Sequence, residues 1–287
     1  MQKIKIVTDS AADIPRDLAN EFGIEILPIL ITYGDKTIRE FYDITPEEYW
    51  DLLLTLDEVP KTAQIQLEAY LNSFKSALEN GYTHLLYISL NSNGSGTYNT
   101  SLIAREMFYA ECGTDLKVEI IDSKTYSFLY GSIVVACSHK VKNGSDFDEI
   151  IKYANEKLKT VCAYLGVYDL KYLKKSGRIS GGAVFIGEAL GLRPISRVFD
   201  GGVNVCDKVR GDANVAKKLV AKVKEDVKNP SEQIAFILHG VCENEAILSI
   251  KDRLLNEVGF KDVYIGKLGA AITTNAGPKS IAILYHR

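Results

Sequence analysis

Leu85-Leu86-Tyr87-Ile88 is a short apolar run that leads into the polar turn Asn91-Ser92-Asn93-Gly94-Ser95-Gly96-Thr97-Tyr98 and then into a helix-like segment. This strand–turn–helix order is typical of an α/β protein. Short hydroxyl and amide side chains, together with bare backbone N–H groups, can bind an anion at such a turn. The turn lacks the lysine of a phosphate-binding loop, so it favours a carboxylate over a triphosphate with its metal. We call residues 91–98 the serine turn.

Strand-like and helix-like segments alternate on both sides of the serine turn, through the first 160 residues. Gly34-Asp35-Lys36 predicts a hairpin, and the capping box Thr45-Pro46-Glu47-Glu48 predicts a helix over Pro46–Leu56. Strands separated by helices indicate a mostly parallel sheet with helices on both faces. The strands predicted in this half are Lys3–Thr8, Ile24–Tyr33, Thr37–Phe41, His84–Leu90 and Val118–Asp122.

The pattern changes near Thr160, which predicts two α/β domains, residues 1–160 and 161–287. In the second half, Gly201-Gly202 between two strand-like runs predicts a tight hairpin. Hairpins mixed with helices indicate a mixed sheet. The predicted strands are Val161–Val167, Ile195–Phe199, Val203–Val209, Ile234–His239, Val263–Leu268 and Ser280–Tyr285, and the predicted helices are Asn214–Val227 and Glu243–Val258.

The amino-acid composition of the chain excludes several classes of protein function. The 287 residues are 46% hydrophobic and 25% charged, with a formal charge of −3, which is typical of a globular protein and gives no reason to expect a nucleic-acid partner. No run is long enough to span a bilayer, and the first residues read as a strand rather than a signal peptide. Five scattered Cys favour reduced thiols and a cytoplasmic location. The four His are far apart, and no spacing resembles a metal site.

Four short polar clusters occur where strands are predicted to end. Because the carboxyl ends of parallel strands face one crevice, the first and third clusters should converge there. Each cluster alone is better explained as a helix cap or turn, and for Asp9 we favour such a structural role, whereas the four clusters together favour a shared ligand site. No His lies near these serines in sequence, and no GxGxxG follows the first strand. The clusters are Thr8-Asp9-Ser10, Thr62-Ala63-Gln64, the serine turn and Thr273-Thr274-Asn275-Ala276-Gly277-Pro278.

A basic, Gly-rich stretch runs from Leu173 to Gly182 and contains Lys174, Lys175 and Arg178. It is either a solvated loop or a patch for a phosphate or for a carboxylate-bearing partner. Arg197 and Arg210 follow soon after, and we expect them to project from the hairpin toward this patch.

The clusters together resemble the DegV family, the fatty-acid-binding proteins that serve as binding subunits of bacterial fatty acid kinase. The resemblance runs nearly end to end. It implies two α/β domains and a lipid tunnel near their interface, in which one long-chain fatty acid such as palmitate, stearate or oleate is held without a cofactor. The matching marks are Val7-Thr8-Asp9-Ser10, Lys61-Thr62-Ala63-Gln64, Ser92–Tyr98, Asp122-Ser123, Ser176-Gly177-Arg178-Ile179, Arg193-Pro194 and Asn275-Ala276-Gly277-Pro278.

Carried over by motif, Thr62 and either Ser92 or Ser95 would hydrogen-bond the carboxylate, beside Gly96 and Thr97. Asn275 in the last loop would supply a third group. The resemblance implies a kinase partner that uses ATP to phosphorylate the bound acid, with Arg178, Arg197 and Arg210 as candidates for docking it or for binding phosphate. Two positions depart from the family pattern: Ala63 stands where a serine is usual, and Asn275 stands where a histidine is usual.

The acyl chain accounts for most of the expected affinity. About 14 methylenes at roughly 0.8 kcal/mol each give on the order of 11 kcal/mol, before the cost of ordering the complex. Two or three neutral donors then suffice to hold the buried carboxylate. Candidate tunnel residues, which could equally be ordinary core, are Ala163, Leu165, Phe185, Ile186 and Leu190.

We therefore expect a non-enzymatic lipid-binding protein without a metal or stable membrane insertion. The alternatives are a lipid sensor without a kinase partner and a small-molecule kinase-like enzyme that acts alone.

Overall fold

The computed structural model describes residues 2–178 and 191–287. The chain forms two compact units. The first comprises Met1–Asp43 and Thr62–Lys159, and the second comprises Ile44–Lys61 and Thr160–Arg287. Residues 44–61 therefore pack with the C-terminal half, although no feature of their sequence separates them from their neighbours.

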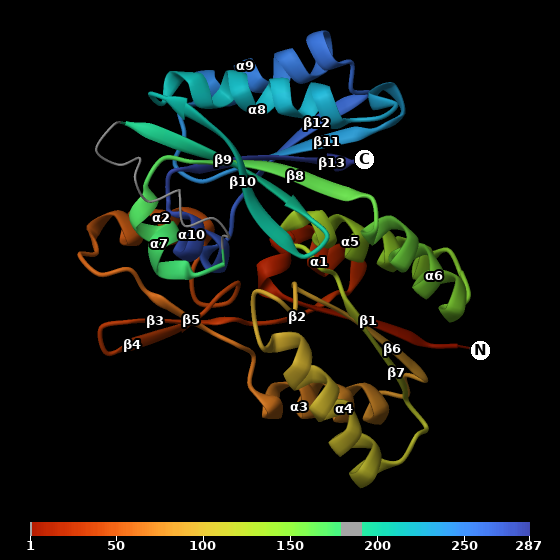
Figure 1. The fold of residues 1–287 in the computed structure, drawn as a ribbon. Coiled ribbons are helices and arrows are strands. Elements are labelled where there is room, and N and C mark those ends of the chain that lie inside the picture. The colour runs from red at the N-terminus through yellow and green to blue at the C-terminus, as the bar shows by residue number, and fades with distance from the viewer. Residues whose placement is uncertain (1, 179–190) are drawn as a thin grey trace. The chain divides into compact units, whose positions relative to one another are not determined.

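The first unit is built on a four-stranded sheet, in the order β2-β1-β6-β7 (Figure 1). All its neighbouring strands are parallel. Residues Leu85–Ile88 of β6 are completely buried, which explains their unbroken apolar character. The strands are β1 (Ile4–Asp9), β2 (Glu25–Leu27), β6 (His84–Ser89) and β7 (Lys117–Asp122).

Helices cover both faces of this sheet, as predicted (Figure 1). On one face, α3 and α4 pack through aromatic rings, with Phe74 and Phe108 centred 5.8 Å apart. The short 3-10 helix Ser10–Ala12 follows β1 directly. The helices are α3 (Leu67–Glu79) and α4 (Thr97–Cys112) on one face, and α1 (Arg16–Phe22), α5 (Phe128–Lys142) and α6 (Phe147–Leu158) on the other.

The prediction of one strand over Ile24–Tyr33 is wrong. β2 ends at Leu27, and β3 (Leu30–Tyr33) belongs to a different, three-stranded sheet with β4 (Lys36–Arg39) and β5 (Lys61–Ala63). Pro28 lies at the break and has no N–H for a strand ladder. The predicted hairpin is confirmed, since Tyr33 pairs with Lys36.

The second unit is built on a six-stranded mixed sheet, in the order β10-β9-β8-β13-β11-β12. Only the β11–β12 pair is parallel among the described pairs. The prediction of a mixed sheet is thus confirmed. The strands are β8 (Val161–Val167), β9 (Leu192–Phe199), β10 (Gly202–Arg210), β11 (Ile234–His239), β12 (Asp262–Lys267) and β13 (Ser280–His286).

The tight hairpin between β9 and β10 lies one residue earlier than predicted. Phe199 pairs with Gly202, so Asp200 and Gly201 form the turn. Both have positive φ, 46° and 76°. An Asp-Gly pair with two positive φ angles is typical of the turn that matches the twist of the strands.

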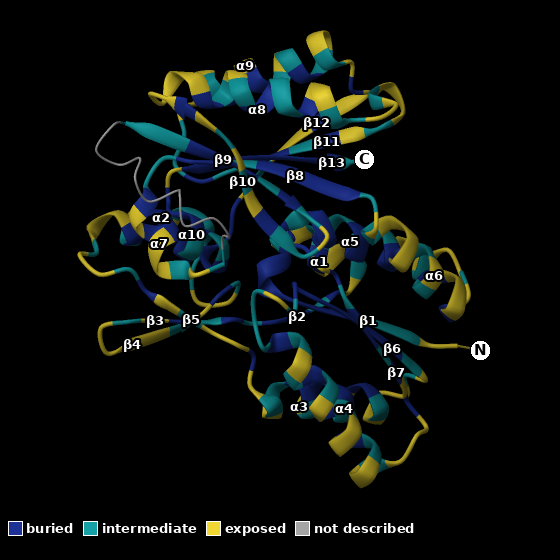
Figure 2. Cartoon of the chain, viewed as in Figure 1, coloured by how far each residue is buried: buried dark blue, intermediate teal, exposed yellow. Residues whose placement is uncertain are grey.

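The two faces of this sheet pack against different helices. On one face lie α8 (Ala213–Asp226), α9 (Asn244–Arg253) and a π-helical turn, Leu254–Val258 (Figure 1). Tyr164 belongs to this core, and a Cβ on Gly166 would lie 2.4 Å from a Val215 methyl carbon, so β8 and α8 are in close contact. On the other face lie α2 (Pro46–Thr55), α7 (Leu170–Ser176) and α10 (Ala270–Ala276). Figure 2 shows the central strands as mostly buried.

Two of these helices were missed in the sequence. α7 falls in the stretch predicted as a loop, with the Asp169 carboxylate accepting from Lys171 N at 3.0 Å and Gly177 ending the helix at φ 67°. α10 contains most of the fourth polar cluster. Each helix has seven residues, too few for a helical period to be recognised. By contrast, the predicted capping box of α2 is present in full.

Candidate functional site

The carboxyl ends of β1 and β6 are joined through Asp9. Its carboxylate accepts hydrogen bonds from Leu90 N at 2.8 Å, Tyr130 Oη at 2.6 Å and Tyr87 Oη at 3.2 Å. Complete burial raises the pKa of Asp9 to about 6, and these hydrogen bonds oppose the rise. Because all three donors belong to the interior of the same unit, Asp9 fastens the strand ends together. This agrees with the structural role that the sequence favoured.

Ser10 is also occupied by internal contacts. Its hydroxyl donates to Glu40 Oε2 at 2.6 Å and accepts from Ile29 N at 2.9 Å. The first polar cluster therefore supports the crevice without offering this hydroxyl to a ligand.

Ser92 and Ser95 differ sharply in their surroundings. Ser92 Oγ donates to Asp122 Oδ2 at 2.5 Å, and Ser92 N donates to Asp122 Oδ1 at 3.1 Å. A ligand carboxylate at Ser92 would have to displace this bond and lie beside a second carboxylate. Ser92 thus joins the ends of β6 and β7 and is the weaker candidate for carboxylate binding.

Ser95 lies at the end of a short hydrogen-bond chain. Ile65 N donates to Thr97 Oγ1 at 3.4 Å, Thr97 N donates to Ser95 Oγ at 3.3 Å, and the two hydroxyl oxygens are 2.9 Å apart. Thr97 is completely buried, whereas Ser95 is partly exposed. A buried hydroxyl proton needs an acceptor, and Ser95 Oγ is within reach of Thr97, so we infer that Thr97 donates to Ser95. The Ser95 proton is then free to point outward, toward an anion.

The second polar cluster lies against the serine turn. A Cβ on Gly96 would be 1.9 Å from Gln64 Oε1, so glycine is needed for Gln64 to lie where it does. Gln64 Nε2 in turn donates to Thr100 Oγ1 at 3.0 Å. Thr62 is partly exposed, and its hydroxyl makes no hydrogen bond within the part of the chain that the structure describes. The structure therefore brings the segment 62–65 together with residues 95–97, as sequence alone could not establish.

Most polar side chains of the fourth cluster form hydrogen bonds within their own helix, α10. Thr273 Oγ1 donates to Gly269 O at 2.9 Å, and Thr274 Oγ1 donates to Ala270 O at 2.7 Å. Asn275 Nδ2 donates to Ala271 O at 2.7 Å, and Asn275 Oδ1 accepts from Arg178 Nη1 at 2.9 Å. Asn275 thus ties α10 to the residue that follows α7.

Arg197 and Arg210 do not converge. They lie on opposite faces of the β9–β10 hairpin, and their positions are roughly 17 Å apart along it, at about 3.3 Å per residue. Arg197 Nη2 donates to Asp226 Oδ2 at 2.8 Å, and Tyr285 Oη donates to the same oxygen at 2.7 Å. The expectation that both arginines project toward one patch is wrong, because strand alternation sends them to different sides.

Of the candidate tunnel residues, Ala163 and Leu165 project from β8 on the face opposite Tyr164. Ala163 is buried, and Leu165 is partly buried against a small cluster that includes Val167, Leu173 and Ala276. Phe185, Ile186 and Leu190 lie outside the described residues, as do Ile179 and the rest of the basic stretch beyond Arg178.

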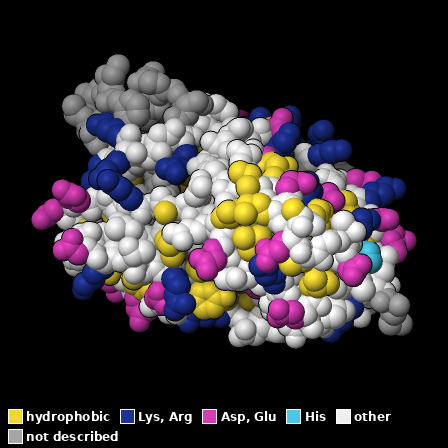
Figure 3. Space-filling view, turned by 90° about the horizontal axis from the view of Figure 1, so that it is seen from below, with side chains coloured by type: hydrophobic (Ala, Val, Ile, Leu, Met, Phe, Trp, Pro, Cys, Tyr) yellow, Lys and Arg dark blue, Asp and Glu magenta, His cyan; other side chains and the backbone are white. Residues whose placement is uncertain are grey.

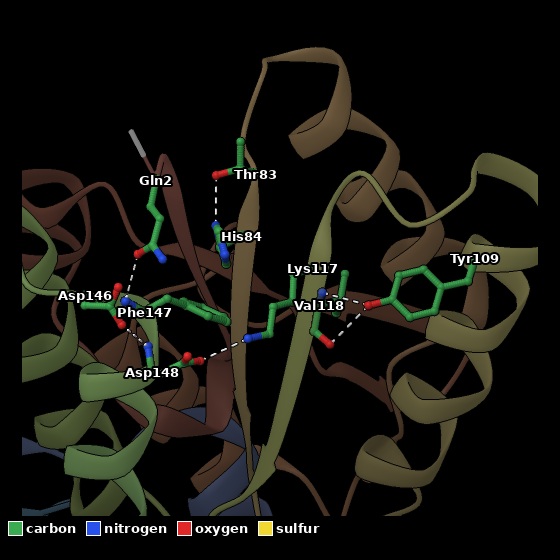
Figure 4. Close-up of polar contacts among 9 residues, drawn as sticks. All are labelled: Gln2, Thr83, His84, Tyr109, Lys117, Val118, Asp146, Phe147 and Asp148. Atoms are coloured by element: carbon green, nitrogen blue, oxygen red, sulfur yellow. Dashed lines mark hydrogen bonds and ion pairs between the residues drawn. The ribbon is translucent and has the colours of Figure 1, made fainter.

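The amino-end edge of the first unit's sheet is closed by its own side chains (Figure 4). Lys117 at the start of β7 contacts Asp148 of α6 at 2.9 Å, and Gln2 accepts from Phe147 N at 2.9 Å. His84 bonds Thr83 at 2.8 Å and lies against the Phe147 ring, where partial burial lowers its pKa. These contacts account for the polar residues at this edge, so the carboxyl edge is the better candidate site.

Two broader findings concern the described part of the chain, residues 2–178 and 191–287. It contains no group of His, Cys, Asp and Glu side chains placed to hold a metal ion. None of its helices combines the length and apolar character that crossing a bilayer requires. On the face shown in Figure 3, basic side chains are interspersed with acidic ones.

Comparison with known proteins gives consistent matches over the whole chain. The profile of the DegV family, a family described as "Uncharacterised protein, DegV family", matches residues 3–287. A DegV domain-containing protein of Clostridium perfringens is 33% identical over 284 residues, which is 99% of each protein. Two solved structures, each 26% identical and covering 100% of this chain and 99% of the other, are DegV from Bacillus subtilis (TM-score 0.85) and a DegV family protein from Streptococcus agalactiae (TM-score 0.87). Both of those proteins are described as fatty acid binding.

Proposed function

The chain belongs to the DegV family, and from this premise we propose that it binds a long-chain fatty acid. The fatty acid binding proteins from B. subtilis and S. agalactiae share its fold along their whole length, which supports the ligand class. The observation that carries the proposal for this chain is the partly exposed Ser95 hydroxyl, whose proton is left free by the chain of hydrogen bonds from Ile65 N.

Ser95 is the main carboxylate donor in this proposal. It accepts from Thr97, and hydroxyls linked in series polarise one another, which makes Ser95 a stronger donor. Thr62, which lies on the segment that contacts the serine turn, is the second donor. The backbone at Gly96, at the start of α4, adds a favourable helix dipole. Ser92 supports the turn through Asp122.

The acyl chain binds to the apolar face of the second unit's sheet that carries Ala163 and Leu165. The small side chains of Ala163 and Ala282 lie on this face with Leu165, whereas the opposite face packs against the α8 and α9 core. Each methylene placed there contributes roughly 0.8 kcal/mol. Most of the affinity therefore comes from the chain, and the head-group donors prevent the loss that an unpartnered carboxylate would cause.

We further propose that the bound acid is presented to a separate, ATP-using kinase that forms the acyl phosphate. Arg178 is the candidate for contacting that partner or the phosphate. Asn275 orients its guanidinium, and Lys174 and Lys175 precede it on α7. A guanidinium held in this way suits a planar or tetrahedral anion. Arg197, which is held by Asp226, is removed from this role.

The test compares two ligands and two variants. The delipidated protein should bind oleate, and its Ser95→Ala variant should bind oleate about 10- to 100-fold more weakly, because a hydrogen bond to a charged group contributes about 1.5–3 kcal/mol. Methyl oleate has no charged head group, so the same substitution should change its binding little. Ser92→Ala is the matched control and should leave the oleate-to-ester ratio unchanged. Equal losses for both ligands would contradict the head-group assignment.

The kinase step is tested separately. The loaded protein is mixed with a fatty acid kinase catalytic subunit and ATP, and acyl phosphate is measured. Arg178→Ala should lower product formation without changing oleate affinity. Oleate binding without any acyl phosphate would remove the kinase partnership and leave a lipid carrier or sensor.

A further inference from the structure

One hydroxyl interrupts the apolar face to which we assign the acyl chain. Strand pairing places Ser196 of β9 directly opposite Leu165 of β8 and Val205 of β10. Leu165 in turn pairs with Ala282 of β13. Since Ile195 and Tyr164 belong to the α8-side core, Ser196 points to the same side as Leu165.

Ser196 is completely buried, and its Oγ has no hydrogen-bond partner. Ser73, in the first unit, is likewise buried without a partner, but other buried serines do have one. Ser280 donates to Gly277 O at 2.9 Å, and Ser138 donates to Val134 O at 3.1 Å. In the second unit, among the described residues, Ser196 is the buried hydroxyl that lacks a partner. Such a group is unfavourable unless something else satisfies it.

Water is a poor candidate for that partner. A buried water needs two to four polar contacts, whereas the residues paired with Ser196, Leu165 and Val205, have purely apolar side chains. Alanine would fill the same space without the unsatisfied oxygen. The hydroxyl is therefore explained by a ligand that brings its own polar group to this depth.

We propose that Ser196 determines acyl-chain specificity, and that the preferred ligands are fatty acids that carry an oxygen substituent, such as a hydroxyl, part-way along the chain. This inference rests on the proposed function, and it narrows the substrate class. A serine hydroxyl can donate and accept, so it pairs equally with a chain hydroxyl or a keto oxygen. A site built around such a bond discriminates against the analogue that lacks the oxygen.

The experiment uses the delipidated full chain, stearate, and a set of hydroxystearate isomers that differ in the position of the hydroxyl. In the unmodified protein, one isomer or two adjacent ones should bind about tenfold more tightly than stearate, which corresponds to about 1.4 kcal/mol. Ser196→Ala keeps the size of the side chain and removes the hydroxyl. It should abolish this preference while stearate binds at least as tightly as before.

Two further variants keep the result interpretable. Ser196→Thr retains a hydroxyl and should retain part of the preference for the same isomer. Ser138→Ala removes a buried serine hydroxyl in the first unit and should leave the preference unchanged. Stearate binding with no preferred isomer, or a preference that survives Ser196→Ala, would overturn the role of Ser196 alone. Failure of stearate and every isomer to bind would instead overturn the proposed function, and this inference with it.

Discussion

Burial of Asp9 should make the stability of the protein depend on pH in an unusual direction. The carboxyl group is completely buried, and this desolvation raises its pKa from an ordinary value of 3.8 to about 6, against the opposing hydrogen bonds from Tyr130, Leu90 and Tyr87. The perturbation is Asp9→Asn, which has nearly the same shape and does not titrate. We follow the free energy of unfolding of both proteins as the pH is changed.

The magnitude follows from the difference between the two pKa values. A difference of about 2 units, at 1.36 kcal/mol per unit, corresponds to about 3 kcal/mol. Between pH 4 and 6 the folded protein retains a proton at Asp9 that the unfolded chain releases. Since the folded state binds more protons there, its stability falls as pH rises. The contribution of the Asp9 proton to the free energy of unfolding is fully present below about pH 4 and is lost above about pH 6.

The assay is urea unfolding of both proteins from pH 4 to pH 7.5. Other carboxylates titrate in both proteins, so we use the difference in free energy between wild type and variant. This difference should shift by up to about 3 kcal/mol against the wild type as pH rises. The variant loses one acceptor for its tyrosine and backbone donors, but that loss does not change with pH. A difference that stays constant, or that moves in favour of the wild type, would refute the argument.

Two glycine substitutions test the close contacts. Gly96→Ala would place a Cβ 1.9 Å from Gln64 Oε1, so Gln64 must move and its hydrogen bond to Thr100 is lost. We expect the affinity for oleate to fall by about tenfold. The free energy of unfolding should fall by only about 1 kcal/mol, the value of one hydrogen bond. Gly166→Ala would place a Cβ 2.4 Å from a Val215 methyl carbon in a packed core, and the free energy of unfolding should fall by about 1–3 kcal/mol. Unchanged urea midpoints in Gly166→Ala would contradict the contact between β8 and α8.

Features set by neighbouring residues could be predicted from the sequence. The helix at Pro46–Thr55 was recognised because its cap is made within four residues, and the hairpin at Gly34 because its turn is local. α7 and α10 were not predicted because seven residues do not display a helical period, and because the two threonines of α10 bond backbone carbonyls of the preceding turn. Pro28 marks the break between β2 and β3, but the apolar residues on both sides of it resemble one continuous strand.

The site depended on partners that are far apart in the chain. No residue near Ser92 or Ser95 in the sequence distinguishes the two serines. Ser92 differs because it bonds Asp122, which lies 30 residues further along the chain. Ser95 differs because it bonds Thr97, which accepts a hydrogen bond from the backbone N–H of Ile65. Strand alternation was the one long-range rule that the sequence did contain. Applied to the hairpin, it would have shown that Arg197 and Arg210 face opposite sides.

The residue at position 275 shows how such a contact changes the expected role of a side chain. The resemblance suggested that Asn275 replaces a histidine that contacts the carboxylate. In the structure its amide oxygen accepts from Arg178 and its amide nitrogen donates to Ala271 O, so both ends of the amide are engaged. A neutral imidazole could make the same two bonds, but a protonated one could not accept from a guanidinium. Asparagine keeps this acceptor at every pH. We propose that Asn275 holds Arg178 in place, and that the orientation of this arginine does not depend on the protonation of residue 275.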